Sequence, residues 1–191
     1  PAACLDVDLT ILQNGRAKRD ASVHVAIPAE IADCAAIDAA AMAFHLVDDL
    51  HGADLWRAGD GAAREGAHQQ VDGVAIGAQL NAVQTLVQRQ RDQGQRQTGT
   101  TAISELKVQS VTLDNSAPDA GKVPTVVIDV CWDVTKVDVL DKSGKSIVSP
   151  NRPDTGWTRY TVANYEYAAD PTGGWRVATG QDLKQTPCAA S

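Results

Sequence analysis

The chain has 191 residues and a formal net charge of −7. This length is enough for one ordinary domain or for two very small ones. The acidic balance excludes the phosphate-neutralising surface that nucleic-acid binding requires, and it gives no attraction to an anionic membrane. No stretch approaches the roughly 18 apolar residues of a membrane-spanning helix, so we expect no transmembrane segment.

Composition divides the chain near its middle. All four His lie in residues 1–100, whereas all three Tyr lie in residues 101–191. The polar, Gln-rich stretch RDQGQRQTGT (91–100) is predicted to be the boundary between these compositions. A helical pattern begins just before this stretch, and we assign it to the second part. We therefore predict two parts, residues 1–78 and residues 79–191.

Residues 1–78 are rich in Ala, Asp and Arg, and their fold stays undetermined at this stage. The apolar residues at helical spacing form only a short stripe, Ile37, Ala41, Phe44, Val47 and Leu50. Two interpretations stay open. Either the segment is a genuine helical or disordered part of the protein, or it is coding sequence read in the wrong frame. In both cases we expect it to add no function.

The most metal-like cluster in this first part is HLVDDLH (45–51). His45 and Asp49 would share a helix face, with His51 and His68 not far along the chain. The zinc motif HExxH is absent, and polar residues beside an apolar stripe are typical of a solvated helix face. We therefore predict no metal site and no cofactor.

A helix is predicted where LNAVQTLVQRQRDQG (80–94) begins the second part. Leu80, Val83 and Val87 have helical spacing, and Gly94 is expected to end the helix.

Strands follow this helix. ISELKVQSVTL (103–113) alternates with a phase slip at Gln109 and Ser110 that is typical of a β-bulge. In VVIDVCWDV (126–134), even-numbered positions form one apolar face, and Val127, Asp129, Cys131 and Asp133 form the other. A third strand is expected in TRYTVANYEY (158–167), with Tyr165 and Tyr167 on one face, and a short closing strand in WRVAT (175–179). Turns between these strands predict an α+β fold, in which a helix precedes a curved antiparallel sheet.

Four segments together carry a family resemblance: LKVQSVTLDN, VVIDVCWDVTKVDVLDKSGK, NRPDTGWTRYTV and GGWRVATGQDLKQTPC. They resemble secreted or lipid-anchored domains of high-GC bacteria with the nuclear transport factor 2-like fold, a superfamily that includes polyketide-cyclase-like and limonene-epoxide-hydrolase-like enzymes. The resemblance covers about residues 79–190 and implies a cone-shaped, cystatin-like sheet. It also implies a long aromatic-rich opening helix, which residues 1–78 do not show.

Enzymes of this superfamily place Asp, His, Tyr or Arg inside the cone. The second part contains no His, so the commonest proton shuttle at neutral pH is missing. The candidate pocket residues are Asp129, Trp132, Arg159, Tyr160 and Trp175, and no catalytic residue is assigned. Asp129 discriminates between two functions: a raised pKa in a cavity would favour a cone-fold hydrolase or isomerase, and pairing with Arg159 would favour a non-catalytic binding domain.

Cys131 has no neighbouring His, Lys or Arg in the sequence to activate its thiol, and Cys188 lies in a polar tail that would fray unless it were fastened. We predict a disulfide between them worth about 4 kcal/mol in the chain-entropy model. Such a bond persists in oxidising compartments, so the protein is expected to be secreted or associated with the cell envelope. The triplet before Cys4 resembles a lipoprotein cleavage site. Pairing of Cys4 and Cys34 stays open.

The expected partner is an unknown protein or a small apolar ligand. A homodimer through the open face of the sheet is also considered, because domains of this superfamily commonly pair in that way. Three acidic residues, Asp129, Asp133 and Asp138, would place like charges across such an interface.

Overall fold

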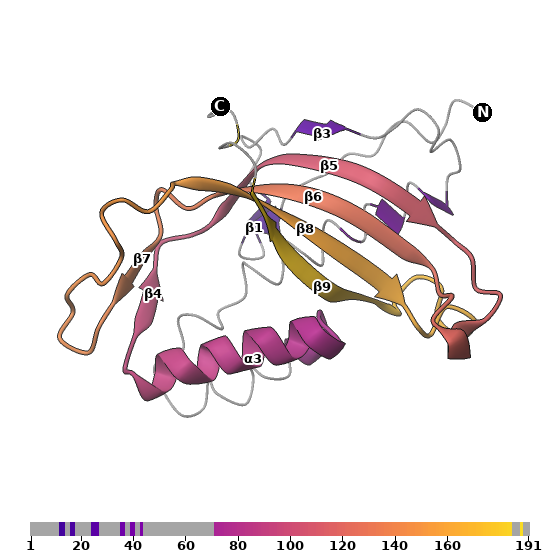
Figure 1. Ribbon diagram of the computed structural model, residues 1–191, viewed down its shortest axis with the longest axis horizontal. Coiled ribbons are helices and arrows are strands. Elements are labelled where there is room, and N and C mark those ends of the chain that lie inside the picture. The colour runs from indigo at the N-terminus through magenta and orange to yellow at the C-terminus, as the bar shows by residue number, and fades with distance from the viewer. Residues whose placement is uncertain are drawn as a thin grey trace.

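The computed structural model of the chain describes residues 71–184 and 188, together with residues 12–13, 16–17, 24–26, 35–36, 39–40 and 43. Figure 1 shows a curved sheet with one long helix beneath it. The α+β prediction, a helix followed by antiparallel strands in the second part of the chain, is confirmed.

The long helix is α3, Gly77–Asp92, which matches the predicted helix. It turns Val83 and Val87 into the core, with Leu80 packed against them. Gly94 follows the helix with a φ of 65°. A side chain is strained in that left-handed conformation, so glycine is the residue that ends the helix at lowest cost.

A five-stranded sheet has the strand order β3-β5-β6-β8-β9. Four of these strands are antiparallel neighbours: β5, Ala102–Thr112; β6, Thr125–Asp133; β8, Thr155–Asn164; β9, Trp175–Leu183. The fifth, β3, His24–Ala26, pairs in parallel with β5 at the edge of the sheet. The short strands β1, Leu12–Gln13, and β2, Arg16–Ala17, pair with each other.

The pairing of β5 with β6 contains two irregularities. One falls between Val108 and Ser110 and confirms the predicted bulge, and a second, between Ile103 and Glu105, was not predicted. Each bulge shifts the alternation by one position and so keeps apolar side chains on the same face.

One face of the sheet packs toward α3 and forms the core. On β6 this inner face consists of Val126, Ile128, Val130 and Trp132, as the alternation predicted. Neighbouring strands add Leu106, Val108, Tyr160, Val162, Trp175 and Val177. The period of two along each strand therefore fixed which side chains are inside.

The core also crosses the predicted boundary at residue 78. Ala39, Ala40, Ala43, Val71 and Ala75 are buried in the same cluster as the inner face of the sheet. Val177 of β9 bonds to this segment on both sides, because its N–H donates to Val74 and its carbonyl accepts from Ile76. Parts of residues 1–78 therefore complete the core of the second part.

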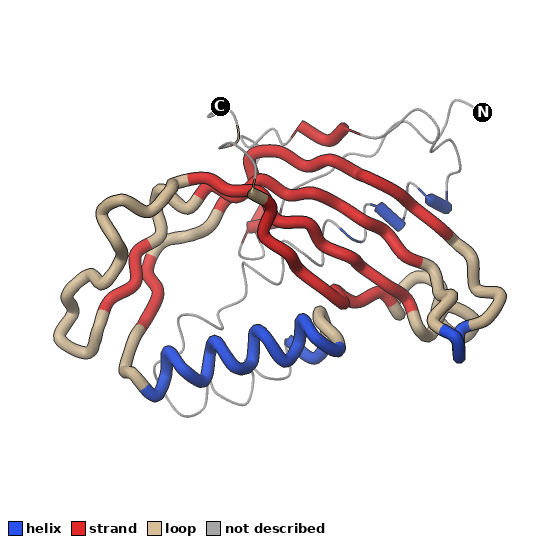
Figure 2. Tube along the Cα trace, viewed as in Figure 1, coloured by secondary structure: helices blue, strands red, loops and turns tan. Residues whose placement is uncertain are grey.

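A two-stranded arm projects from the end of the sheet near the C-terminal end of α3 (Figures 1 and 2). It pairs β4, Arg96–Thr98, with β7, Asp138–Leu140. The guanidinium of Arg152 holds the base of the arm by donating to the carbonyls of Val134 and Val137, at 2.8 and 3.0 Å. The stretch 91–100, predicted to be a boundary, is thus the end of α3 and one strand of the arm.

The ends of the last two strands differ from the sequence prediction. Strand β8 stops at Asn164, so Tyr165 and Tyr167 lie in the following turn and do not share a strand face. The fully buried Asn164 ends the strand because its side chain donates to the carbonyl of Asp170 and accepts from the N–H of Glu166. Strand β9 runs on to Leu183, beyond the predicted Thr179. A 3-10 turn, Pro118–Ala120, lies between β5 and β6.

Gly99 provides a test of how the arm joins the sheet. Its φ is 76°, and a Cβ at this position would overlap the carbonyl of Lys136. We expect Gly99→Ala to lower the free energy of unfolding by about 3 kcal/mol, since backbone strain and a steric clash add. Gly121→Ala is the matched control, because Gly121 has a similar φ of 80° and open space around it; there we expect about 1 kcal/mol. Equal losses in urea denaturation would contradict the close approach at Gly99.

Candidate functional site

Asp129 and Arg159 face each other across β6 and β8 on the outer face of the sheet, the face opposite the core. Arg159 Nε and Nη2 donate to the two carboxylate oxygens of Asp129 at 2.6 and 2.8 Å. The Asp129 side chain is 5% exposed and the Arg159 side chain 41%. In the sequence-based prediction, a pair between Asp129 and Arg159 favours a non-catalytic binding domain. Both carboxylate oxygens are occupied, so Asp129 is not presented to a substrate.

Lys107 lies opposite Asp129 on the other neighbouring strand, β5. Its ammonium is 3.0 Å from a carboxylate oxygen of Glu105 and 4.2 Å from the centre of the Trp157 ring. The outer face therefore carries a row of alternating charges above a buried aromatic ring. The charge of Asp129 is therefore neutralised by its neighbours. Asp129 is one of the three acidic residues that were expected to oppose a dimer through like-charge repulsion.

The five predicted pocket residues do not form one pocket. Trp132, Tyr160 and Trp175 are buried on the inner face, whereas Asp129 and Arg159 lie on the outer face. The physical reason is the strand alternation, which points adjacent residues such as Arg159 and Tyr160 to opposite sides of a sheet.

The inner aromatic residues pack as core. Trp132 and Tyr160 make an edge-to-face contact with ring centres 6.1 Å apart. Burial raises the pKa of Tyr160 far above its usual value, although a hydrogen bond with Trp132 opposes the shift. A tyrosine in this environment keeps its proton at neutral pH and is a poor acid–base catalyst.

The disulfide between Cys131 and Cys188 is present in the structure. It belongs to a small outer cluster with Trp157 and Leu183, which is separate from the main core. The hydroxyl of Ser104, which lies at the unpredicted bulge of β5, donates to Cys131 Sγ at 2.9 Å. Cys188 is thus fastened to the outer face, as expected from the sequence.

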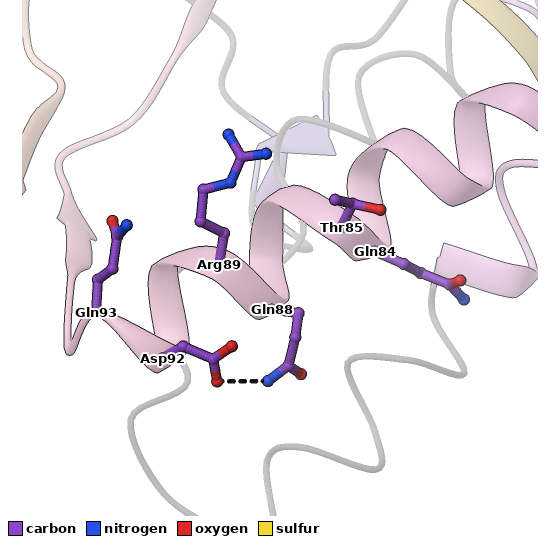
Figure 3. Close-up of a pocket in the computed structure, with 6 residues that line it drawn as sticks. All are labelled: Gln84, Thr85, Gln88, Arg89, Asp92 and Gln93. Atoms are coloured by element: carbon purple, nitrogen blue, oxygen red, sulfur yellow. Dashed lines mark hydrogen bonds between the residues drawn. The ribbon is translucent and has the colours of Figure 1, made fainter.

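Two hollows on the described part of the chain contain no predicted pocket residue. One, of about 640 Å³, follows α3 and is lined by Gln84, Thr85, Gln88, Arg89, Asp92 and Gln93; Figure 3 shows these side chains and the 2.7 Å hydrogen bond from Gln88 to Asp92. The other, of about 340 Å³, lies at the arm and includes Lys136, Asp138, Ser146, Arg152 and Asp154. The surface of the hollow at the arm is mostly polar, whereas that of the hollow along α3 comes mostly from apolar atoms of its polar residues.

Two of the structurally important polar residues were missed in the sequence, Arg152 and Asn164. Both act by bonding backbone groups across loops, and no local pattern marks such a role.

The position of Asp138 differs from the sequence prediction. It is in the arm rather than on the sheet, where its carboxylate accepts from the Val139 N–H and the Ser146 hydroxyl. Asp133 accepts from Thr135, and this hydrogen bond lowers the pKa of Asp133. The lowered pKa keeps Asp133 charged, so only Asp129, which is paired, and Asp138, which lies in the arm, drop out of the like-charge argument against a dimer.

The candidate metal cluster HLVDDLH and His68 lie outside the described residues, as do Cys4 and Cys34. Within the described part of the chain, no group of three or more His, Cys, Asp or Glu could hold a metal ion. Among the helices that the structure describes, none is long and apolar enough to span a membrane.

No protein-family model and no curated protein matches the chain. Among solved structures, it is similar to the intermembrane space region of the chloroplast protein ARC6, with 18% identity and a TM-score of 0.45 over 74% of this chain and 93% of that one. It is also similar to a de novo designed β-sheet protein, with 15% identity and a TM-score of 0.25 over 82% and 90%. At these values neither likeness bears on function.

The Asp129–Arg159 pair provides a test of the outer face. Arg159→Gln leaves a buried carboxylate without its cation, and we expect a loss of about 2 kcal/mol, reduced from the usual cost because Arg159 is partly exposed. Asp129→Asn alone and the double variant complete a mutant cycle, in which the double loss should be smaller than the sum of the single losses. Glu105→Gln, in the exposed pair with Lys107, is the control, with about 0.5 kcal/mol expected. Additive losses in urea denaturation would show that Asp129 does not depend on Arg159.

Proposed function

We propose that the protein is a non-catalytic domain that works outside the cytoplasm and binds a protein partner. The observation that carries this proposal is the pairing of Asp129 with Arg159 on the outer face. A catalytic carboxylate needs access to substrate and a perturbing environment in a cavity. Asp129 instead has both oxygens bonded to one guanidinium.

The inner face of the sheet supports the same proposal. In the superfamily that the sequence resembles, the catalytic groups line the interior of the cone. Here the corresponding side chains of β6, Val126, Ile128 and Val130, are fully buried by packing. Tyr160 holds its proton firmly. The described residues therefore offer no acid–base pair on that side.

A protein partner is favoured over a small apolar ligand. Small apolar ligands bind in enclosed, mostly apolar cavities. The hollow at the arm is mostly polar, and the hollow along α3, although most of its surface is apolar, is wide open to solvent. Large apolar side chains are exposed instead at separate places on the surface. Ile147 follows the arm and is 45% exposed, and Tyr165 follows β8 and is 51% exposed.

The disulfide supports a location outside the cytoplasm. Cytosolic thiols are kept reduced, and stable structural disulfides are found in secreted and envelope proteins. Both sulfurs of this bond belong to buried residues, which is typical of a structural disulfide rather than an exposed catalytic one.

Photo-crosslinking in the native compartment tests the proposal. A photoreactive residue replaces Tyr165 or Ile147, and Lys122, exposed in the loop between β5 and β6, is the control position. We expect at least one of the two apolar positions, and not Lys122, to form an adduct with one specific protein. In parallel, purified protein should not turn over ester or epoxide substrates.

Two results would contradict this function. A turnover that Asp129→Asn abolishes in a folded protein would support the cone-fold hydrolase that the sequence also allows. A low-molecular-weight apolar molecule found bound by native mass spectrometry, with no protein adduct, would support the ligand-binding alternative.

A further inference from the structure

The disulfide lies outside the main core, so the packing of the inner face does not involve it. Cys131, Cys188 and Trp157 are 0%, 6% and 6% exposed, and they form a cluster distinct from the inner face. The inner face keeps its own apolar contacts whether or not this bond is intact. Opening of the bond is therefore expected to be a local event.

The two sulfurs differ in how they can be reached. Cys131 is in the middle of β6, paired with Glu105 of β5 on one side and Trp157 of β8 on the other. The Cys131 sulfur lies on the outer face beneath Cys188 and Trp157, so a thiolate could reach it only after these side chains moved. Cys188 belongs to no strand and follows β9, which ends at Leu183. Moving a residue outside the strands costs less free energy than moving a residue of a central strand.

The surroundings of Cys131 favour its departure as a thiolate. The Ser104 hydroxyl is 2.9 Å from Cys131 Sγ, held there by the bulge between Ile103 and Glu105. A hydroxyl that donates to sulfur stabilises negative charge on it. Exchange is faster when the departing sulfur carries charge easily.

We propose that Cys188 is a modification site at which low-molecular-weight thiols and dithiols exchange with the disulfide, with Cys131 as the departing sulfur. The attacking thiolate forms a bond to Cys188 Sγ while the Cys131–Cys188 bond breaks. The electron pair of that bond goes to Cys131 Sγ, which accepts the hydrogen bond from Ser104. The product is a mixed disulfide on Cys188.

A dithiol completes the reduction. Its second thiolate attacks the sulfur already joined to Cys188, so the dithiol becomes a disulfide and Cys188 leaves as a thiolate. Two electrons pass from the dithiol to the protein, and solvent supplies the protons that the two cysteines take up. Once Cys188 is released, Trp157 loses one of the side chains that bury it, while Lys107 and Leu183 remain. This exchange goes beyond the proposed partner binding and does not depend on it.

Peptide mapping of the full chain tests the direction of attack. The oxidised protein is incubated with reduced glutathione, quenched with acid, alkylated and digested, so that the peptides of Cys4 and Cys34 are read separately. We expect glutathione on Cys188 and the alkyl group on Cys131, in about tenfold excess over the reverse pattern. Glutathione mainly on Cys131, equal amounts on both, or no exchange at either would overturn the proposal.

Ser104→Ala tests the role of the hydroxyl, with Ser110→Ala as the matched control because Ser110 is exposed on the same strand. Exchange should slow several-fold in Ser104→Ala and stay unchanged in Ser110→Ala, at the same site in both. Equal rates would remove Ser104 from the mechanism.

Quenching of tryptophan fluorescence by acrylamide tests whether Cys188 covers Trp157. The wild type and Trp157→Phe are compared before and after reduction with dithiothreitol, so that the difference between them reports on Trp157. We expect this residue to be quenched more strongly after reduction, with the far-ultraviolet circular dichroism retained. Unchanged quenching would mean that Cys188 does not cover this ring.

Discussion

Strand β6 is buried on both faces, and the rest of the structure follows from that constraint. Its inner side chains, such as Ile128, pack in the core, but Asp129 and Cys131 on the outer face are buried as well. A central strand can carry a buried carboxylate only beside a cation, and the sulfur of Cys131 is covered by its disulfide partner Cys188. Arg159 and Cys188 therefore cover this part of the outer face with an ion pair and a disulfide.

The same constraint limits the chemistry of this region. Asp129 is bound through both oxygens, Tyr160 is held protonated by burial, and Trp132 contacts that ring. Groups fixed in this way stabilise a fold and do not move protons. We therefore propose interactions at the surface rather than catalysis inside the sheet.

The arm and the disulfide are two additions to the sheet, one beyond its end and one on its outer face. The arm carries β4 and β7 away from the sheet and is held at its base by Arg152, whose guanidinium bonds two backbone carbonyls. The disulfide holds Cys188 on the outer face beside Trp157. A rigid projection loses little conformational entropy when a partner binds, which makes the arm suited to recognition.

The sequence by itself determined the helix, the bulge at Gln109 and the two faces of β6, because the spacing of apolar residues along one segment specifies each of them. The Cys131–Cys188 disulfide was predicted because Cys131 has no neighbouring group that would activate its thiol. The same alternation also places Asp129 and Trp132 on opposite faces of β6, so it already argues against a pocket that contains both. Tertiary structure alone decided the arm, the strand added by His24–Ala26 and the clamp by Arg152. These depend on backbone hydrogen bonds between segments far apart in the chain, and neither side-chain spacing nor composition specifies which distant backbone groups will meet.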